Sequence, residues 1–338
     1  MERESNTQYI LSLSYGKDSL ACLAAIERLG LPLDRIVHAE VWATDTISAD
    51  LPPMVEFKKK ADAIIKERWG IEVEHICAMA KDGTKQTYEK LFYHVPKRKY
   101  IKDLPQGTVM GFPLSVKAWC NSELKVNSLD SAANTIGGGR TPIQSGSNQR
   151  ICEHQSTLLH RTAQNQTSEY WDFQSSKGIG VPTSNAVFSK SSLAQGAKIN
   201  TVQYLGIAAD EPERIARHTK DGFILPLVEI GWDEAYCRKW CEENDLLSPI
   251  YTTATRGGCW FCHNQPIDQL RLLRKNYPEY WQLLLKWDSD SPVTFKADGH
   301  TVRDFDKRFE LEELGLIDIK KPFRWKMLDE SQTVIVGI

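Results

Sequence analysis

The chain has no excess of charge of one sign and no long apolar run. Its 42 basic and 44 acidic residues nearly cancel, so no overall field marks it as a nucleic-acid binder. No apolar segment approaches the length of a membrane span, and the first residues, Met-Glu-Arg-Glu-Ser-Asn, do not form a signal peptide. We therefore expect a cytoplasmic protein with no membrane partner. In that compartment the eight cysteines indicate metal, cluster or redox chemistry before structural disulfides.

The sequence also lacks a Walker A loop, but it contains another phosphate-binding pattern. Residues 12–19 read Ser-Leu-Ser-Tyr-Gly-Lys-Asp-Ser, between an apolar run and a segment with helical apolar spacing. This predicts a strand, a tight turn and a helix. Such a turn gathers backbone N–H groups, hydroxyls and one ammonium at the positive end of a helix dipole, which suits phosphate or pyrophosphate. The candidate nucleotide-binding residues of this turn are Ser14, Gly16, Lys17, Asp18 and Ser19.

Apolar strands that alternate with amphipathic helices predict an α/β fold with a parallel, Rossmann-like sheet flanked by helices. The turn at 12–19 then lies at the carboxyl end of the first strand, where open α/β sheets bind ligands. The expected strands are near 8–14, 36–43, 73–77 and 201–208. The expected helices are near 18–29, 53–69, 85–93, 233–244, 266–276 and 278–287.

The segment 131–199 differs in composition from the rest of the chain. Of its 69 residues, 28 are Ser, Thr, Asn or Gln and nine are Asp, Glu, Lys or Arg, and it holds neither helical nor strand periodicity for long. We therefore expect a polar insertion of low order, which leaves 1–130 and 200–265 as one nucleotide-binding domain. Residues 266–338 are expected to form a mainly helical C-terminal extension.

Four blocks, in order along the chain, resemble the phosphoadenosine-phosphosulfate (PAPS) reductase-like family of the adenine nucleotide α-hydrolase superfamily. The first is the turn at 12–19, which is similar to the PP-loop of the N-type ATP pyrophosphatases. The others are Val-Trp-Ala-Thr-Asp-Thr at 41–46, Trp-Cys-Asn-Ser-Glu-Leu-Lys at 119–125, and Gly-Ile-Ala-Ala-Asp-Glu-Pro-Glu-Arg at 206–214. Ala208 stands where many members carry Arg. The resemblance covers about residues 8–128 and 200–287.

These blocks supply further candidates for the handling of ATP with Mg²⁺. Asp45, at the tip of the second expected strand, has the position and charge to bind Mg²⁺ or an edge of the nucleotide. Lys125 is placed to meet anionic substrate oxygens, Asp210 to form part of the nucleotide rim, and Arg256 to reach the phosphates. Each has an ordinary alternative, as a turn or helix-cap carboxylate or as a solvated surface cation.

The cysteines form a second signal. Residues 255–263 read Thr-Arg-Gly-Gly-Cys-Trp-Phe-Cys-His, a Cys-x2-Cys pair that is half of a tetrahedral sulfur site. Cys120 lies in the block where cluster-bearing relatives contribute a cysteine. Cys241 lies on the helix that leads to the pair, with Cys237 one turn earlier as its alternative. The candidate metal ligands are Cys120, Cys241, Cys259 and Cys262.

Several groups are compatible with these cysteines. A [4Fe-4S] cluster is favoured by four cysteines in a PP-loop relative, and zinc, with His263 as a further ligand, is the alternative. A redox dithiol is a third interpretation. Cys-x2-Cys-His also matches a c-type haem attachment, but that requires an exported protein.

The leading hypothesis is an ATP-dependent enzyme that adenylates its substrate, releases pyrophosphate and couples this to sulfur transfer from a donor protein. Lys17, Asp45 and Arg256 would then act electrostatically on an acceptor that is a nucleic acid or a small molecule. One alternative is a sulfonucleotide reductase, but such reductases use a C-terminal cysteine, and here the 76 residues after Cys262 contain none. The other is a non-catalytic, nucleotide-binding regulatory protein.

Overall fold

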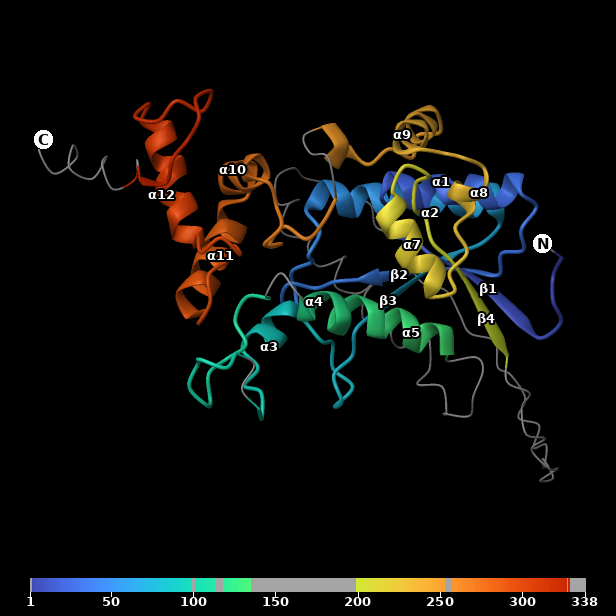
Figure 1. The fold of residues 1–338 in the computed structure, drawn as a ribbon, viewed down its shortest axis with the longest axis horizontal. Coiled ribbons are helices and arrows are strands. Elements are labelled where there is room, and N and C mark those ends of the chain that lie inside the picture. The colour runs from blue at the N-terminus through green and yellow to red at the C-terminus, as the bar shows by residue number, and fades with distance from the viewer. Residues whose placement is uncertain are drawn as a thin grey trace, which may run out of the picture.

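The structure is a computed structural model that describes residues 2–98, 101–113, 118–134, 199–252, 257–326 and 328. At its centre lie four strands: β1 (Thr7–Ser12), β2 (Arg35–Glu40), β3 (Val73–Cys77) and β4 (Asn200–Tyr204). They form one all-parallel sheet in the order β3-β2-β1-β4, as Figure 1 shows. The predicted α/β class with a parallel sheet is confirmed. Because the strand order reverses at β1, the carboxyl ends of β1 and β4 flank the position where such sheets bind ligands.

Helices cover both faces of the sheet (Figure 1). On one face lie α1 (Lys17–Arg28) and α2 (Pro52–Trp69), and on the other lies α5 (Asn127–Asn134). Because side chains alternate along a strand, Tyr9 and Leu11 of β1 pack in the cluster of α1 and α2. Ile10, between them, packs instead with Leu129 and Ala132 of α5. Alternation within β1 therefore builds both apolar layers.

The C-terminal helices share a second apolar cluster with segments that follow the strands. The helices are α10 (Ile267–Asn276), α11 (Pro278–Asp290) and α12 (Val302–Glu313), and they pack near α3 (Tyr88–Phe92) and α4 (Trp119–Asn121). The ring centroid of Tyr88 lies 4.9 Å from that of Trp119 and 5.1 Å from that of Trp287. The remaining short elements are η1 (Ser122–Val126), α7 (Pro212–Lys220), α8 (Pro226–Glu229), α9 (Glu234–Glu243) and η2 (Pro249–Thr252).

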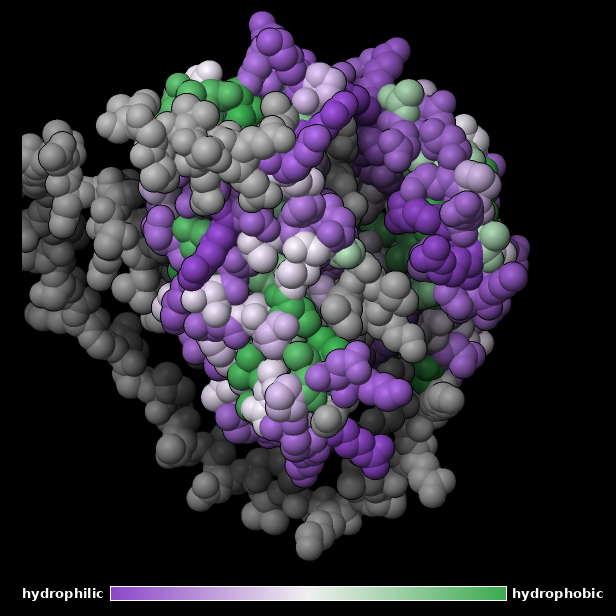
Figure 2. Space-filling model, turned by 60° about the vertical axis from the view of Figure 1, so that its left-hand side comes forward, coloured by the Kyte–Doolittle hydropathy of each residue, from purple (hydrophilic) through white to green (hydrophobic). Residues whose placement is uncertain are grey.

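Hydrophilic residues predominate on the face drawn in Figure 2, where hydrophobic residues gather in several small areas. Large exposed apolar side chains include Leu314, Leu316 and Ile319, which follow α12. None of the helices among the described residues combines the length and the apolar composition that crossing a membrane requires.

Several predicted element ends differ from the structure, among them the end of the fourth strand, which lies at Tyr204 and not at 208. The second strand ends at Glu40 and not at 43, because the chain turns back: the Ala43 N–H donates to the Ile47 carbonyl (2.8 Å) and the Ala49 N–H to the Val41 carbonyl (3.0 Å). The predicted insertion begins too early, since its first four residues, 131–134, are the last turn of α5. Residues 135–198 of that predicted segment lie outside the described residues.

Replacing residues 135–198 with a short Gly-Ser linker is expected to leave a folded protein. The two ends to be joined both lie near the amino-terminal ends of the strands. The Arg35 guanidinium at the start of β2 donates to the Ala132 carbonyl and to Gln8 (both 3.1 Å). Gln8 in turn pairs with Thr201 in β4. Shortening a loop changes its closure free energy by less than about 1 kcal/mol per halving of length. Circular dichroism during heating would check this, and loss of the cooperative transition would show that the segment is integral to the fold.

Candidate functional site

The predicted phosphate loop, residues 12–19, joins β1 to α1 beside the point where the strand order reverses. Gly16 is the N-cap of α1 and offers no side-chain cap, so acceptors from outside the helix can reach its first amides. The Ser19 hydroxyl lies 3.0 Å from that of Ser14, and the Lys17 N–H donates to the Tyr251 hydroxyl (3.2 Å). N–H groups of the loop therefore donate to hydroxyl oxygens at the N-terminus of a helix. Oxygens of a bound anion accept hydrogen bonds from N–H groups in the same position.

The chain after β4 passes directly over the start of α1. A Cβ atom on Gly206 would lie 2.5 Å from the Ser19 Cα and 2.6 Å from the Asp18 carbonyl oxygen. Both neighbours are backbone atoms that cannot rotate away. A glycine is therefore required here, and it lets the fourth sequence block, at 206–214, contact the phosphate loop.

Substituting Gly206→Ala is expected to reduce the free energy of unfolding by about 1–3 kcal/mol, the usual cost of overpacking. It should also weaken binding at the phosphate loop, since the start of α1 must shift. Chemical denaturation would measure the first effect. Gly257→Ala is the matched control, because a Cβ atom there meets nothing within 4 Å. Equal stability of the two variants would contradict this close approach.

Lys17 extends its ammonium into a group of carboxylates at the mouth of the loop. Its Nζ lies 3.0 Å from Asp18 and 3.3 Å from Glu234. Burial disfavours its charge, but these two carboxylates outweigh the burial and raise the Lys17 pKa, so the side chain is a cation at neutral pH. Oxygens of Asp18, Glu211 and Glu234 lie within 4.8 Å of one another. Asp210 joins this rim by accepting the Glu234 N–H (3.1 Å).

Asp45 is not brought to this loop by any contact in the described structure. It lies in the turn after β2 and forms an ion pair with Lys90 (2.8 Å), with 63% of its side chain exposed. The carboxylate that faces the interior from the same segment is Asp50, 2.5 Å from the Lys58 ammonium. Sequence reasoning missed Asp50, although it too follows the second strand closely. Arg256, the other predicted catalytic residue, lies outside the described residues.

Three of the four candidate cysteines share the electrostatic environment of one half-buried lysine. Cys120 is on α4, and Cys259 and Cys262 are on the loop before α10. Lys125, on the π-helical turn η1, has a pKa raised by Cys259 first and also by Cys120 and Cys262. Burial raises the pKa of Cys120 to about 11 and that of Cys259 to about 12, while Lys125 opposes both shifts. These thiols thus share one charged environment.

The loop that carries Cys259 and Cys262 is held from two sides. The Trp260 backbone N–H donates to the Ala49 carbonyl (2.9 Å), and its indole N–H donates to the Ser48 carbonyl (2.9 Å). From the other side the Lys296 ammonium donates to the His263 carbonyl (2.6 Å). The Cys-x2-Cys pair is therefore fixed against the turn that follows β2.

The structure separates Cys241 from the other three candidate cysteines. Its thiol is buried between α9 and α1, where it donates to the Lys17 carbonyl (3.2 Å). Cys241, its alternative Cys237 and Cys22 belong to the apolar cluster of α1, whereas Cys120 and Cys259 border the cluster of the C-terminal helices. The four predicted ligands are thus not brought together: Cys120, Cys259 and Cys262 lie in one region, and Cys241 lies in a separate apolar core.

The spacing of the three thiols bears on which group they fit. Among the described residues, they are not one of the groups whose ligand atoms all lie within 4.8 Å of one another. Four thiolates around one zinc ion, with Zn–S bonds of about 2.3 Å, require S···S distances of roughly 3.8 Å. A multi-iron core, itself several ångströms across, holds its thiolates further apart. In the part of the chain that the structure describes, the three thiols are therefore not already arranged as ligands of a single ion.

Asp50 is a carboxylate with an electrostatic effect at both candidate sites. Burial is the main cause of the raised pKa of Cys259, and Asp50 adds to it. In Tyr15, burial, Asp62 and Glu40 raise the pKa more than Asp50 does. Asp50 also pairs with Lys58, whose ammonium lies 2.7 Å from His38. The two candidate sites are therefore within electrostatic reach of one carboxylate.

No family model, curated protein or solved structure matches this chain. The resemblance to the PAPS reductase-like family consequently depends on the four sequence blocks.

Proposed function

We propose that this chain is a PP-loop enzyme that uses ATP with Mg²⁺ to adenylate an acceptor, releases pyrophosphate and transfers sulfur to the activated acceptor. The observation that carries the proposal is that the loop with Cys259 and Cys262 is hydrogen-bonded, through Trp260, to the turn after β2, and that β2 pairs with β1, the strand that leads into the phosphate loop. A phosphate loop alone would fit any nucleotide-binding protein. Its combination with three grouped thiols favours sulfur chemistry on a nucleotide-activated substrate.

In the first step, an acceptor oxygen attacks the α phosphorus of ATP, and the bond to the bridging oxygen breaks with its electron pair leaving on pyrophosphate. Negative charge then develops at the α phosphate and on the leaving group. The Lys17 ammonium and the start of α1, which has no side-chain cap, are suited to stabilise that charge. The carboxylates of Asp18, Glu211 and Glu234 are oxygen ligands of the kind that Mg²⁺ prefers.

In the second step, a sulfur nucleophile displaces AMP from the adenylated acceptor. Cys120, Cys259 and Cys262 would hold an iron–sulfur cluster, which when bound would supply sulfide-binding or redox chemistry at this position. Lys125 carries the positive charge that favours the thiolate forms of Cys120 and Cys259, against the effect of burial on their pKa values. The sulfur itself would come from a donor protein, and the acceptor is a nucleic acid or a small molecule.

Radiolabelled ATP tests this proposal directly. Full-length protein, prepared anaerobically, would be incubated with Mg²⁺, fractions of cellular nucleic acid or metabolites, sulfide as the sulfur donor, and ATP labelled either at the α phosphate, to follow AMP, or at the γ phosphate, to follow pyrophosphate. We expect equal amounts of AMP and pyrophosphate, formed only when an acceptor is present. Formation of ADP, or failure to bind a non-hydrolysable ATP analogue, would contradict the proposal. A parallel assay of adenylyl sulfate reduction with thioredoxin tests the reductase alternative.

A further inference from the structure

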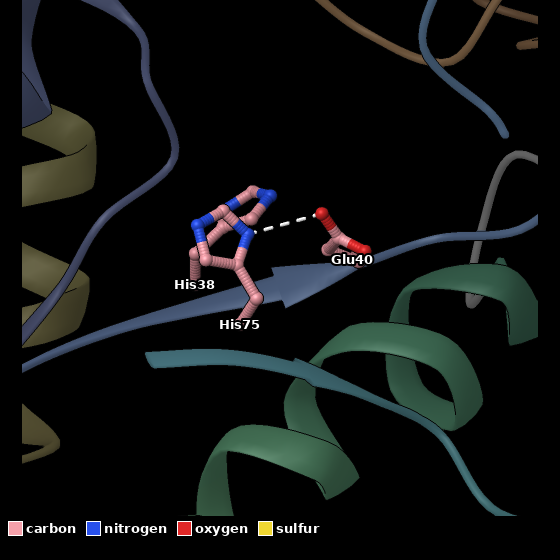
Figure 3. A group of neighbouring side chains, drawn as sticks. All are labelled: His38, Glu40 and His75. Carbon is pink, nitrogen blue, oxygen red and sulfur yellow. Dashed lines mark hydrogen bonds and ion pairs between the residues drawn. The ribbon is translucent and has the colours of Figure 1, made fainter. Parts of the chain in front are cut away.

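A second group of metal-ligand side chains lies beneath the phosphate loop, between the sheet and α2. His38 and Glu40 are two residues apart on β2, so their side chains leave the same face of the sheet, and His75 stands opposite His38 on β3. Figure 3 shows the two imidazole rings side by side with the Glu40 carboxylate directed at His75. One ligand atom from each of the three residues lies within 4.8 Å of the other two.

We propose that His38, Glu40 and His75 bind one divalent transition-metal ion, with zinc as the best match. Two imidazoles and one carboxylate are a donor set that proteins use for zinc and similar ions. The site is separate from the thiols and from the nucleotide, so it stands or falls independently of the proposed function. It ties β2 and β3 together immediately below the loop.

The contacts around the two histidines already have the form of an outer coordination shell. Nδ1 of His38 lies 2.8 Å from the Leu13 carbonyl oxygen, which makes this nitrogen the donor and leaves the lone pair of Nε2 for a cation. Nε2 of His75 lies 3.0 Å from the Asp62 carboxylate, and Nδ1 lies 3.0 Å from Glu40. Burial disfavours the charge of His75, but these two carboxylates raise its pKa to about 9, so a bound ion would take the place of the Nδ1 proton. Carbonyl–His–metal and carboxylate–His–metal arrangements of this kind orient the ligands of metal sites.

A cation already faces the lone pair of His38. The Lys58 ammonium lies 2.7 Å from Nε2 of His38 and 2.5 Å from Asp50. We infer that this ammonium takes the place of the ion in the metal-free protein and that it stays with Asp50 alone when the ion binds. The side chains of Glu40 and His75 are each 22% exposed, which gives the ion a path from solvent. Lys58 is therefore a built-in competitor of the metal.

Titration with Co²⁺ tests the site in the full-length, chelator-treated protein. We expect about one Co²⁺ per chain, with ligand-field absorption, in Cys259→Ser, where the thiol site is disabled. His38→Ala, His75→Ala and Glu40→Gln should each weaken this binding at least about tenfold. Lys58→Met should tighten it severalfold, because the competing cation is gone. His94→Ala, at an exposed histidine, is the matched control and should change nothing.

Lys58→Met should tighten Co²⁺ binding, whereas the three ligand variants should weaken it. An ion-pair network with a structural role alone would not produce this opposite change in affinity. Co²⁺ binding that is unaffected by His38→Ala and His75→Ala would overturn the proposal, as would a folded Lys58→Met that binds no more tightly. Thermal unfolding provides a test that leaves His38, Glu40 and His75 unchanged. Zn²⁺ should raise the thermal midpoint of the wild type and of Cys259→Ser in a concentration-dependent manner. An unchanged midpoint in Cys259→Ser would overturn the site.

Discussion

Lys17→Ala is expected to lower the rate of ATP turnover by a factor of about a hundred or more. The Lys17 ammonium is the cation held at the start of α1, where the phosphates would meet the helix dipole. Its removal also leaves the carboxylates of Asp18 and Glu234 without their partner, and these would then repel a nucleotide. Binding and the chemical step should therefore both suffer. AMP formation under saturating and limiting ATP would separate the two effects.

The same substitution should leave the fold intact, because Lys17 is in the first turn of α1 and contributes no apolar side chain to the core cluster. Lys60→Ala is a suitable control, since that lysine also pairs with a carboxylate, Asp245, but on the surface of α2. It should retain full turnover. A well-folded Lys17→Ala protein with unchanged pyrophosphate release would exclude the assignment of residues 12–19 as the phosphate loop.

The sequence was most informative where one short segment contains the whole signal. The start of α1 was predicted to within one residue, because strand, glycine turn and amphipathic helix follow each other within residues 7–28. The end of β2 was predicted too late, because Val41 and Ala43 continue the apolar run but are buried in the second core, beyond the sheet. Apolar character predicts burial, and it does not say which of two cores a residue enters.

The same limit applies to the candidate site. Ser14, Lys17 and Ser19 are neighbours in sequence, so a local motif placed them together, whereas Tyr251 reaches the loop from 234 residues away. Asp50 carries no motif that separates it from Asp45. The position of Cys241 depends on which face of α9 meets α1, and that is set by helix packing rather than by cysteine spacing.

The cysteines give the second large expected effect. Protein purified without oxygen should be brown, with broad absorbance at about 400 nm from thiolate-bound iron. Cys120→Ser, Cys259→Ser and Cys262→Ser should each bleach this colour, because each removes one of the three thiols that share the field of Lys125. Cys241→Ser should remain coloured, since its thiol donates to the Lys17 carbonyl in a different core. Iron and sulfide counts would accompany the spectra.

Cys241→Ser is the decisive variant because the two lines of reasoning differ on it. The sequence spacing makes Cys241 a ligand, whereas the packing of α9 on α1 keeps its thiol with Cys22 and Cys237. Bleaching in a folded Cys241→Ser protein would show that α9 moves to complete a four-cysteine site. Stoichiometric zinc without iron in the wild type would instead replace the cluster with a structural ion. Retained colour in Cys241→Ser, with loss of colour in the variants of Cys120, Cys259 and Cys262, would show that these three thiols bind the cluster. The fourth ligand of the cluster would then be a group other than a buried core thiol.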